Sequence, residues 1–233
     1  MEDTVNIAKS DIWKAIWLAD NASTPSKISD LLKSFLPSKE IKSSPGKVKF
    51  AIVIGHNKSA TGAYAKAPLN MSEFQMHSLI TDLLVKRADS DPNIEIKGFE
   101  RKPVKSYTAQ ILECYKRVND WDPDYVIELH FNWLNGAGRV EMIYHTGSKV
   151  GLQMAKVALK TVSNFIPGKQ KTIPRGKKDR GGLSLASAKA PAIMTEAFDC
   201  SNEDHRKTVS DLGIDGQARM YYTIIEKISK LVE

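Results

Sequence analysis

Hydrophobic residues from residue 47 onward follow two patterns that alternate along the chain. Short apolar runs rich in β-branched residues, which are typical of buried strands, occupy residues 48–54, 94–99, 124–130, 139–145 and 191–195. Segments with apolar residues at helical spacing, which predict helices, occupy residues 71–87, 107–118, 151–162 and 214–231. This alternation predicts an α/β domain built on a mixed, mostly parallel twisted sheet with helices on both faces.

The first 46 residues show a different pattern. Ser10 can cap a helix that carries Trp13 and Trp17 on one apolar face, and a second run of helical spacing follows it. The polar stretch SKEIKSSPGK that comes next is typical of a linker. We therefore expect residues 1–46 to form a small helical segment and linker that packs on the main domain, residues 47–233, or binds cell wall or another partner.

Three polar side chains stand at the ends of predicted strands that are otherwise apolar. His56 follows FAIVIG, His130 ends YVIELH, and Glu196 follows AIMT. Functional groups of an open α/β sheet collect at the carboxyl ends of its strands. One such residue alone is as often structural as functional, but three in corresponding positions predict a functional site.

The residue types at these positions suit a metal centre. Zinc hydrolases commonly bind the ion through three His, Glu or Asp side chains and leave a fourth position for water. His56 and His130 supply two nitrogens, and the carboxylate is expected from a neighbouring element. Glu73, near the start of the next helix, is one candidate, although an acid there also suits the helix dipole. Glu128 is the other, because it lies two residues before His130 on the same strand face, as a ligand or as a partner of the histidine.

Three further histidines have simpler interpretations. His77 lies one helical turn after Glu73, and we expect it to pack against neighbours or to lie at the surface. His145, at the end of a predicted strand, and His205, in the acidic start of a predicted helix, are both expected at the surface.

The net charge of the chain indicates which kind of molecule it binds. The chain has 34 Lys and Arg against 27 Asp and Glu, a net charge of +7 that indicates an anionic partner. We expect no nucleic acid, because the chain lacks a helix-turn-helix, a zinc finger and the aromatic ribonucleoprotein motifs. The anionic polymers of a cell envelope are the alternative. The densest charge, residues 169–180, is interrupted by Pro174 and Gly176 and predicts a solvated loop.

The sequence also bears on membranes and on the redox compartment. No apolar run approaches the roughly 20 residues that cross a bilayer. The first residues lack the basic, apolar and small-residue order of a secretory signal, so we expect synthesis in a cytoplasm without general export. Cys114 and Cys200 form no CxxC pair and are expected to be ordinary buried or half-buried thiols.

Four segments carry a resemblance to a known family. They are the loop IGHNKSATGAYA, the helix SEFQMHSLITDLL, the strand end VIELHFNW and the segment AIMTEAFDCSNEDH. Each is a weak signal alone, but their order, spacing and strand context are specific. From residue 47 to the end, about four-fifths of the chain, the sequence resembles the zinc-dependent N-acetylmuramoyl-L-alanine amidases of bacterial autolysins and phage endolysins.

The resemblance assigns roles to the candidate residues. It implies that residues 47–233 form a zinc amidase catalytic domain. One zinc ion would be held by His56, Glu73 and His130. Glu196 would be the catalytic acid/base residue. The substrate would be peptidoglycan, cut at the amide bond between the lactyl group of N-acetylmuramic acid and L-alanine of the stem peptide.

The resemblance also points to residues around the substrate. Asn132, two residues past the third ligand, would orient substrate or close the loop, and the structural role is favoured. Arg175 and Arg180, in the region ahead of the last strand, would meet peptide carboxylates. The loop of His56 departs from the family, with Val-Ile before Gly-His and Asn-Lys after it, which indicates a divergent member.

The biological setting and two rival functions follow from the same residues. A chain without an export signal suits a phage endolysin that reaches the wall through a holin-type lesion, or a non-exported autolysin, and we expect a monomer. A zinc carboxypeptidase or other cell-wall peptidase usually takes its first histidine and its glutamate from one HxxE element, whereas His56 and Glu73 are a whole loop apart. A non-catalytic basic module that binds cell wall would not need Glu196 at a strand end.

Overall fold

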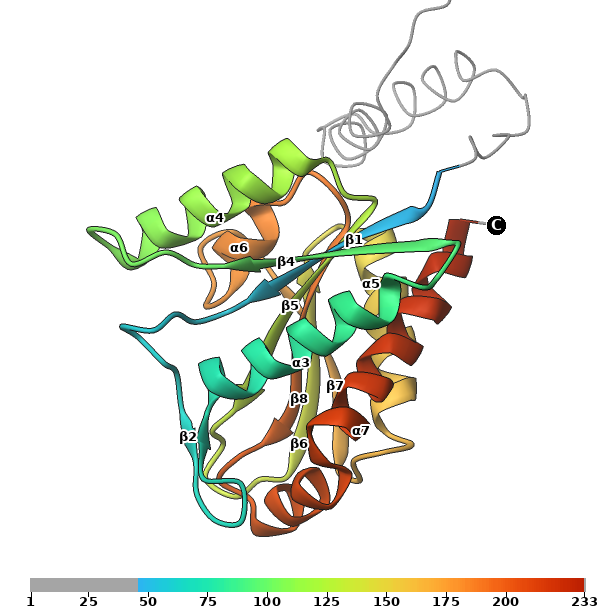
Figure 1. Cartoon of the computed structure of the whole chain (residues 1–233). Coiled ribbons are helices and arrows are strands. Elements are labelled where there is room, and N and C mark those ends of the chain that lie inside the picture. Colours follow the sequence, from blue (N-terminus) through green and yellow to red (C-terminus); the bar gives the residue numbers. More distant parts are fainter. Residues whose placement is uncertain (1–45, 233) are drawn as a thin grey trace, which may run out of the picture.

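A computed structural model describes residues 46–232, and a six-stranded sheet forms its centre (Figure 1). In spatial order the strands are β4 (Ile94–Glu100), β1 (Val48–Ile54), β5 (Tyr125–Asn132), β8 (Ala192–Asp199), β6 (Arg139–His145) and β7 (Lys169–Arg175). The first four are parallel to one another, β6 is antiparallel to β8, and β7 is parallel to β6. The predicted α/β class with a mixed, mostly parallel sheet is therefore confirmed.

Helices cover both faces of this sheet and divide the core into two parts. One face is covered by α3 (Glu73–Ala88), α5 (Lys149–Val162) and α7 (Glu203–Ser229), and α7 packs against both of the others. On the other face α4 (Tyr107–Trp121) packs against α6 (Gly182–Ser187). The short 3-10 helix η1 (Lys230–Val232) follows α7, and β2 (Tyr64–Ala65) pairs with β3 (Met71–Ser72) as a separate antiparallel ribbon.

The strands feed both parts of the core because successive side chains point to opposite faces. In β1, Phe50 and Ile52 join the core under α3, α5 and α7, whereas Ala51 and Val53 join the core under α4 and α6. Every residue of β5 and β8 is buried, which is typical of central strands covered on both sides. A charged or titratable side chain on these two strands is therefore enclosed by protein, and its partners decide its chemistry.

The helices begin at capping residues, and this shifts one predicted boundary. The helix predicted from residue 71 begins at Glu73, because Met71–Ser72 is strand β3 and Ser72 is the cap. The Ser72 hydroxyl accepts from the Gln75 amide at 3.3 Å, and the Gln75 side chain accepts from the Ser72 amide at 3.0 Å. The predicted helix 214–231 is the second part of α7, because Gly213, with a φ of +63°, breaks the helical geometry; the first part begins at Glu203 and is capped by Asn202.

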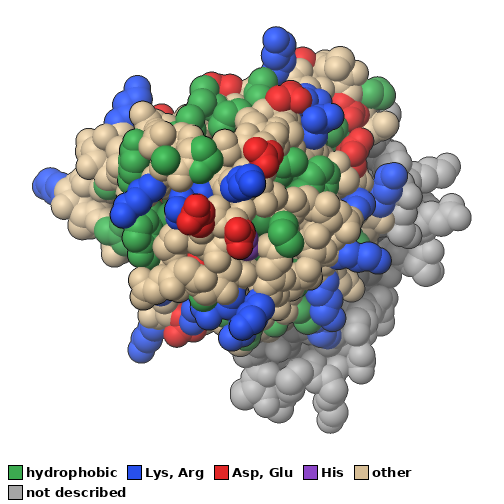
Figure 2. All heavy atoms as spheres, turned by 90° about the horizontal axis from the view of Figure 1, so that it is seen from below, with side chains coloured by type: hydrophobic (Ala, Val, Ile, Leu, Met, Phe, Trp, Pro, Cys, Tyr) green, Lys and Arg blue, Asp and Glu red, His purple; other side chains and the backbone are tan. Residues whose placement is uncertain are grey.

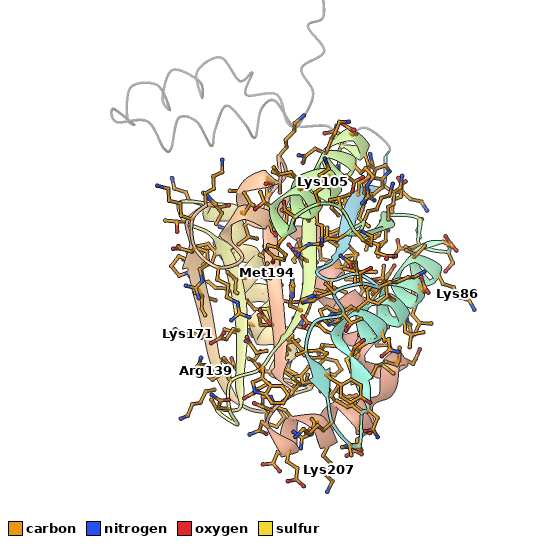
Figure 3. The ribbon with its side chains drawn as sticks, turned by 90° about the vertical axis from the view of Figure 1, so that its left-hand side faces the viewer. Lys86, Lys105, Arg139, Lys171, Met194 and Lys207 are labelled. Carbon is orange, nitrogen blue, oxygen red and sulfur yellow. The ribbon has the colours of Figure 1, made fainter. Side chains whose placement is uncertain are left out.

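The prediction of a solvated loop over residues 169–180 is wrong for its first seven residues. They form β7, whose register with β6 runs from Lys169 opposite Arg139 to Arg175 opposite His145. An edge strand tolerates exposed lysines and a proline because its outer side makes no ladder. Figure 3 shows Lys171 at this outer edge and Met194 of β8 deeper in the domain.

Three smaller expectations concern the thiols, membranes and the N-terminal segment. Both cysteines are buried free thiols, as predicted. Among the described residues no helix is long and apolar enough to cross a membrane. The helices expected within residues 1–46 lie outside the described residues, and the division of the chain near residue 46 stays a prediction.

Candidate metal centre

Three neighbouring parallel strands bring the predicted site residues to one edge of the sheet. His130 on β5 and Glu196 on β8 are register partners. The Gly55 amide donates to the Leu129 carbonyl at 3.3 Å, so His56 follows β1 at the same edge. Figure 2 shows the molecule from below, the side toward which β8 points in Figure 1. A small exposed area of histidine is visible there among acidic and basic side chains. His56, His130 and Glu196 thus lie at the carboxyl ends of neighbouring strands, where functional groups of such sheets collect.

Glu73 lies between the two histidines. Its Oε2 is 3.2 Å from His56 Nε2, and its Oε1 is 2.8 Å from His130 Nδ1. The two imidazole rings meet edge to face, with centroids 5.0 Å apart. One ligand atom from each of the three residues lies within 4.8 Å of the others, so this group can hold a metal ion.

The start of α3 fixes the position of Glu73. The carboxylate accepts from the Ala63 amide at 3.2 Å and from the Phe131 amide at 3.1 Å. Burial raises the pKa of the Glu73 carboxyl, but the hydrogen bonds and charges of His130 and His56 outweigh burial and hold it well below its usual value. Glu73 is therefore a fixed anion at neutral pH, which is the form that a metal ligand needs.

Two glycines allow the backbone to approach this group closely. A Cβ on Gly55 would lie 2.0 Å from His130 Nε2, a distance that no atom pair tolerates without movement. A Cβ on Gly62 would lie 2.6 Å from Glu73 Oε2 and 2.8 Å from His56 Cδ2, and Gly62 also has a left-handed φ of +76°. The loop between β1 and α3 thus packs directly on the three side chains.

Glu128, the alternative carboxylate, lies on the opposite side of the His130 ring. Its Oε1 is 3.1 Å from His130 Nε2, so the two ring nitrogens of His130 face two different carboxylates. Glu128 also forms a buried ion pair with Arg101 and accepts from the Tyr115 hydroxyl at 2.7 Å. Glu128 therefore contacts His130 through a different ring nitrogen from the one that Glu73 contacts.

Arg101 and Tyr115 were not predicted from the sequence as members of the site. Arg101 stands directly after β4, the same strand-end position that marks His56, but its partner Glu128 is 27 residues away. Tyr115 belongs to the apolar face of α4, and helical spacing alone gives no reason to assign it a polar contact.

Glu196 is a buried carboxyl of unusual character. Its Oε2 has no hydrogen-bond partner within the described part of the chain. Burial raises the pKa of Glu196 to about 7, although the charges of His130 and Arg180 act in the opposite direction. A carboxyl with a pKa near neutrality can both take up and release a proton under physiological conditions.

The remaining predicted residues are not all brought to this edge. Asn132 is buried and donates to Glu141 Oε2 at 2.9 Å. Arg180 is exposed on the loop between β7 and α6, and its charge acts on Glu196. Arg175 is opposite His145 at the far end of β7 and does not join the site.

The other histidines have structural positions. His205 was predicted at the surface, and this is wrong: it is buried, and its Nδ1 accepts from the Asp199 amide at 3.0 Å because α7 begins close to the end of β8. His77 is buried against the Phe131 ring, with centroids 5.6 Å apart, in agreement with the packing alternative. His145 is half-buried at the end of β6.

The fold and the site together define a class of protein. A mostly parallel α/β domain that gathers two histidines, an ionised carboxylate and a buried carboxyl of raised pKa at the carboxyl ends of its strands has the features of a hydrolytic enzyme. The family model described as N-acetylmuramoyl-L-alanine amidase matches residues 51–230. The chain belongs to this amidase family, and its substrate is peptidoglycan.

Solved structures share the fold. The chain is similar to the catalytic domain of the CD27L endolysin targeting Clostridia difficile, with 24% identity, a TM-score of 0.63, and coverage of 78% of this chain and 96% of that one. It is similar to Cwp6 from Clostridium difficile (19% identity, TM-score 0.67), covering 82% of this chain and 30% of that one. It is also similar to the amidase AmiC2 of Nostoc punctiforme (17%, 0.60), covering 81% and 99%. No curated protein matches the sequence.

Proposed function

We propose that this amidase is zinc-dependent and cuts the bond between the lactyl group of N-acetylmuramic acid and L-alanine of the stem peptide. One observation carries the proposal. His56, Glu73 and His130 converge at a sheet edge, with ligand atoms within 4.8 Å of one another, and Glu196 is the register neighbour of His130.

The donor set fits zinc. Two imidazole nitrogens and one carboxylate oxygen form a common set in catalytic zinc sites, which leaves one position for water or substrate. The side chains come from three elements, and each ring directs a nitrogen at the carboxylate of Glu73. A zinc ion held by these residues supplies a Lewis acid that polarises the scissile carbonyl and activates water.

Glu196 serves as the acid/base residue in this proposal. Its carboxylate takes a proton from the attacking water and delivers it to the amine of L-alanine as the amide bond breaks. The pKa of about 7 suits both steps, because neither form of the carboxyl is strongly favoured at neutral pH. Its unpartnered Oε2 is not committed to another described group.

Arg180 is the residue that we propose to meet a carboxylate of the stem peptide. It is exposed, and its charge already reaches Glu196. Asn132, whose amide is occupied by Glu141, closes the end of β5 instead of binding substrate. Arg175 is left out of the binding site, because it lies at the other end of β7.

Mass spectrometry of digested peptidoglycan tests the proposal directly. The zinc-loaded enzyme should release stem peptides with a free L-alanine amine and leave glycan with free lactyl groups. Treatment with a chelator and the variant His56→Ala should both prevent release, and zinc should restore only the chelated wild type. New ends within the peptide would identify a zinc peptidase, and binding to wall without any release would identify a binding module.

We further propose that this activity is bacteriolytic, in an endolysin or an autolysin. The net charge of +7 favours contact with an anionic envelope, and the fold is shared with an endolysin catalytic domain. Purified protein added to permeabilised bacteria should lower their turbidity, whereas protein that releases stem peptides from isolated walls but leaves whole cells intact would contradict the lytic role.

A further inference from the structure

Both ring nitrogens of His130 are engaged, and each faces a different carboxylate. Nδ1 lies 2.8 Å from Glu73 Oε1, on the side where His56 also lies. Nε2 lies 3.1 Å from Glu128 Oε1. The ring also packs on the backbone of Gly55, where a Cβ would come within 2.0 Å of Nε2. The His130 ring is therefore held on three sides.

Glu128 is itself held by elements outside the candidate metal group. Arg101, which is 1% exposed, forms an ion pair with Glu128 and donates to the Ser184 hydroxyl at 3.0 Å. Tyr115 on α4 donates to the second oxygen of Glu128 at 2.7 Å. A buried ion pair is costly to desolvate, and this one places a charged residue on a central strand. Simple core packing would be served equally well by apolar side chains at these two positions.

A neutral imidazole has one N–H donor and one lone pair. With its proton on Nε2, His130 donates to Glu128 and presents the lone pair of Nδ1 toward Glu73 and His56. If the proton were on Nδ1, then Nε2 and the Glu128 carboxylate would both be acceptors, with no hydrogen between them. A carboxylate fixed behind a histidine thus selects the nitrogen that faces the metal.

We propose that Glu128 is a positioning residue that fixes His130 with Nδ1 toward the metal, and that Arg101 and Tyr115 hold Glu128 in place. This inference rests on the proposed zinc site. It adds a chain of contacts that links Arg101 after β4, Tyr115 of α4 and Ser184 of α6 to one ligand of that site. Partners of this kind typically change metal affinity by about 10- to 100-fold when removed.

Zinc affinity of the metal-free protein, measured by competition with a chelator, is the first readout. The variant Glu128→Gln keeps an acceptor oxygen and should bind zinc about 10-fold more weakly than wild type. The double variant Glu128→Leu/Arg101→Leu removes the ion pair as a unit, which protects folding, and should lose up to about 100-fold. Asp199→Asn, a change to another buried carboxylate that touches none of the three ligands, is the matched control and should bind zinc as wild type does.

The state of the His130 ring is the second readout, and a merely structural role for Glu128 would not change it. In the zinc-loaded wild type, the ¹⁵N shifts of His130 should show metal at Nδ1 and a proton at Nε2. The double variant should lose this single state. If both Glu128 variants bind zinc within threefold of wild type and keep the ring state, the inference is overturned while the zinc site stands. A wild-type protein that binds no zinc would overturn the site and this inference together.

Discussion

Glu196 and Glu73 are both buried carboxyls of the same site, and their surroundings give them opposite properties. Glu73 accepts hydrogen bonds from two backbone amides and faces two histidines, so its pKa falls well below the usual range despite burial. Glu196 keeps one oxygen without a described partner, and burial raises its pKa to about 7. Two residues of one type thus suit two tasks, a fixed anion and a proton carrier.

Glu196→Gln should abolish most of the activity and keep the metal. The amide cannot exchange a proton, so we expect kcat on purified peptidoglycan to fall by about 10² to 10⁴. Zinc content should remain at one ion per chain, because Glu196 is not in the ligand group. Glu203→Gln, a change to an exposed acid at the start of α7, is the control and should retain wild-type kcat. Wild-type release of stem peptides by Glu196→Gln would refute the catalytic role.

The raised pKa of Glu196 also predicts how stability depends on pH in the metal-free protein. The folded state binds this proton with a pKa of about 7 and the unfolded state with the usual 4.5, so folding favours the protonated form. The free energy of unfolding should therefore fall as pH rises from about 4.5 to about 7, by roughly 2 to 4 kcal/mol from this group.

Thermal melts of metal-free wild type and Glu196→Gln check this sign. The Gln variant should melt at a higher temperature than wild type at pH 8, and the gap should close below pH 5, where wild-type Glu196 is protonated. A gap that is the same at both pH values would show that the carboxyl is not the source of the difference.

The residues of the site were predictable from sequence as far as strand ends reveal them. His56, His130 and Glu196 each end an apolar strand, and parallel strands bring such ends together. The choice between Glu73 and Glu128 could not be made from the residues alone, because it depends on which side of the His130 ring each carboxylate occupies. That side is set by Arg101 and Tyr115, whose contacts with Glu128 cross three elements of the fold.

At the scale of elements, the glycine that follows β1 leaves the space that the His130 ring occupies. Gly55→Ala should displace the His130 ring, since the new Cβ would lie 2.0 Å from Nε2. We expect zinc affinity to fall by at least about 10-fold, as for loss of a residue that orients a ligand. Gly176→Ala is the matched control, because its Cβ meets only a side-chain oxygen at 3.5 Å and its φ is not left-handed.

Zinc titration followed by ¹⁵N spectra of both glycine variants separates a local effect from misfolding. The Gly55 variant should keep the dispersed spectrum of a folded protein and lose the His130 signals of the zinc-bound state. Tight zinc binding by Gly55→Ala would show that the β1 loop can move away from the ring.

Buried strands were easier to predict from the sequence than the exposed edge strand, because burial requires a continuous run of apolar residues. β5 and β8 are fully buried, so their apolar runs are continuous and unmistakable. β7 is an edge strand, and one of its sides pairs with no other strand. Lysines and Pro174 are tolerated on such a strand, so its composition resembles that of a loop. The two parts of α7 were predicted separately, from the acidic start that contains His205 and from the apolar spacing after residue 214, because Gly213 interrupts the pattern between them.

At the scale of the whole molecule, positive charge is spread widely. Figure 3 shows Lys86, Lys105, Arg139, Lys171 and Lys207 at separate places around the domain. With a net charge of +7, attraction to an anionic wall should act at long range and be screened by salt. Hydrolysis of whole cell walls should therefore slow several-fold between about 0.05 M and about 0.5 M NaCl.

A soluble muramoyl peptide is the control for this effect. Its hydrolysis should change much less over the same range of salt, because a small substrate does not depend on long-range attraction to the wall polymer. Equal salt sensitivity for both substrates would locate the effect in the catalytic site instead of the surface charge.

The two termini of the domain lie at the same end of the molecule, and this affects how the domain can be joined to others. β1 begins at Val48 and α7 ends at Ser229, and both lie at the upper end of the molecule in Figure 1. The carboxyl ends of β1, β5 and β8 lie away from this upper end, and His56 and His130 of the candidate metal group follow from β1 and β5 there. A tether attached at either end of the domain thus leaves the opposite edge open to a polymer.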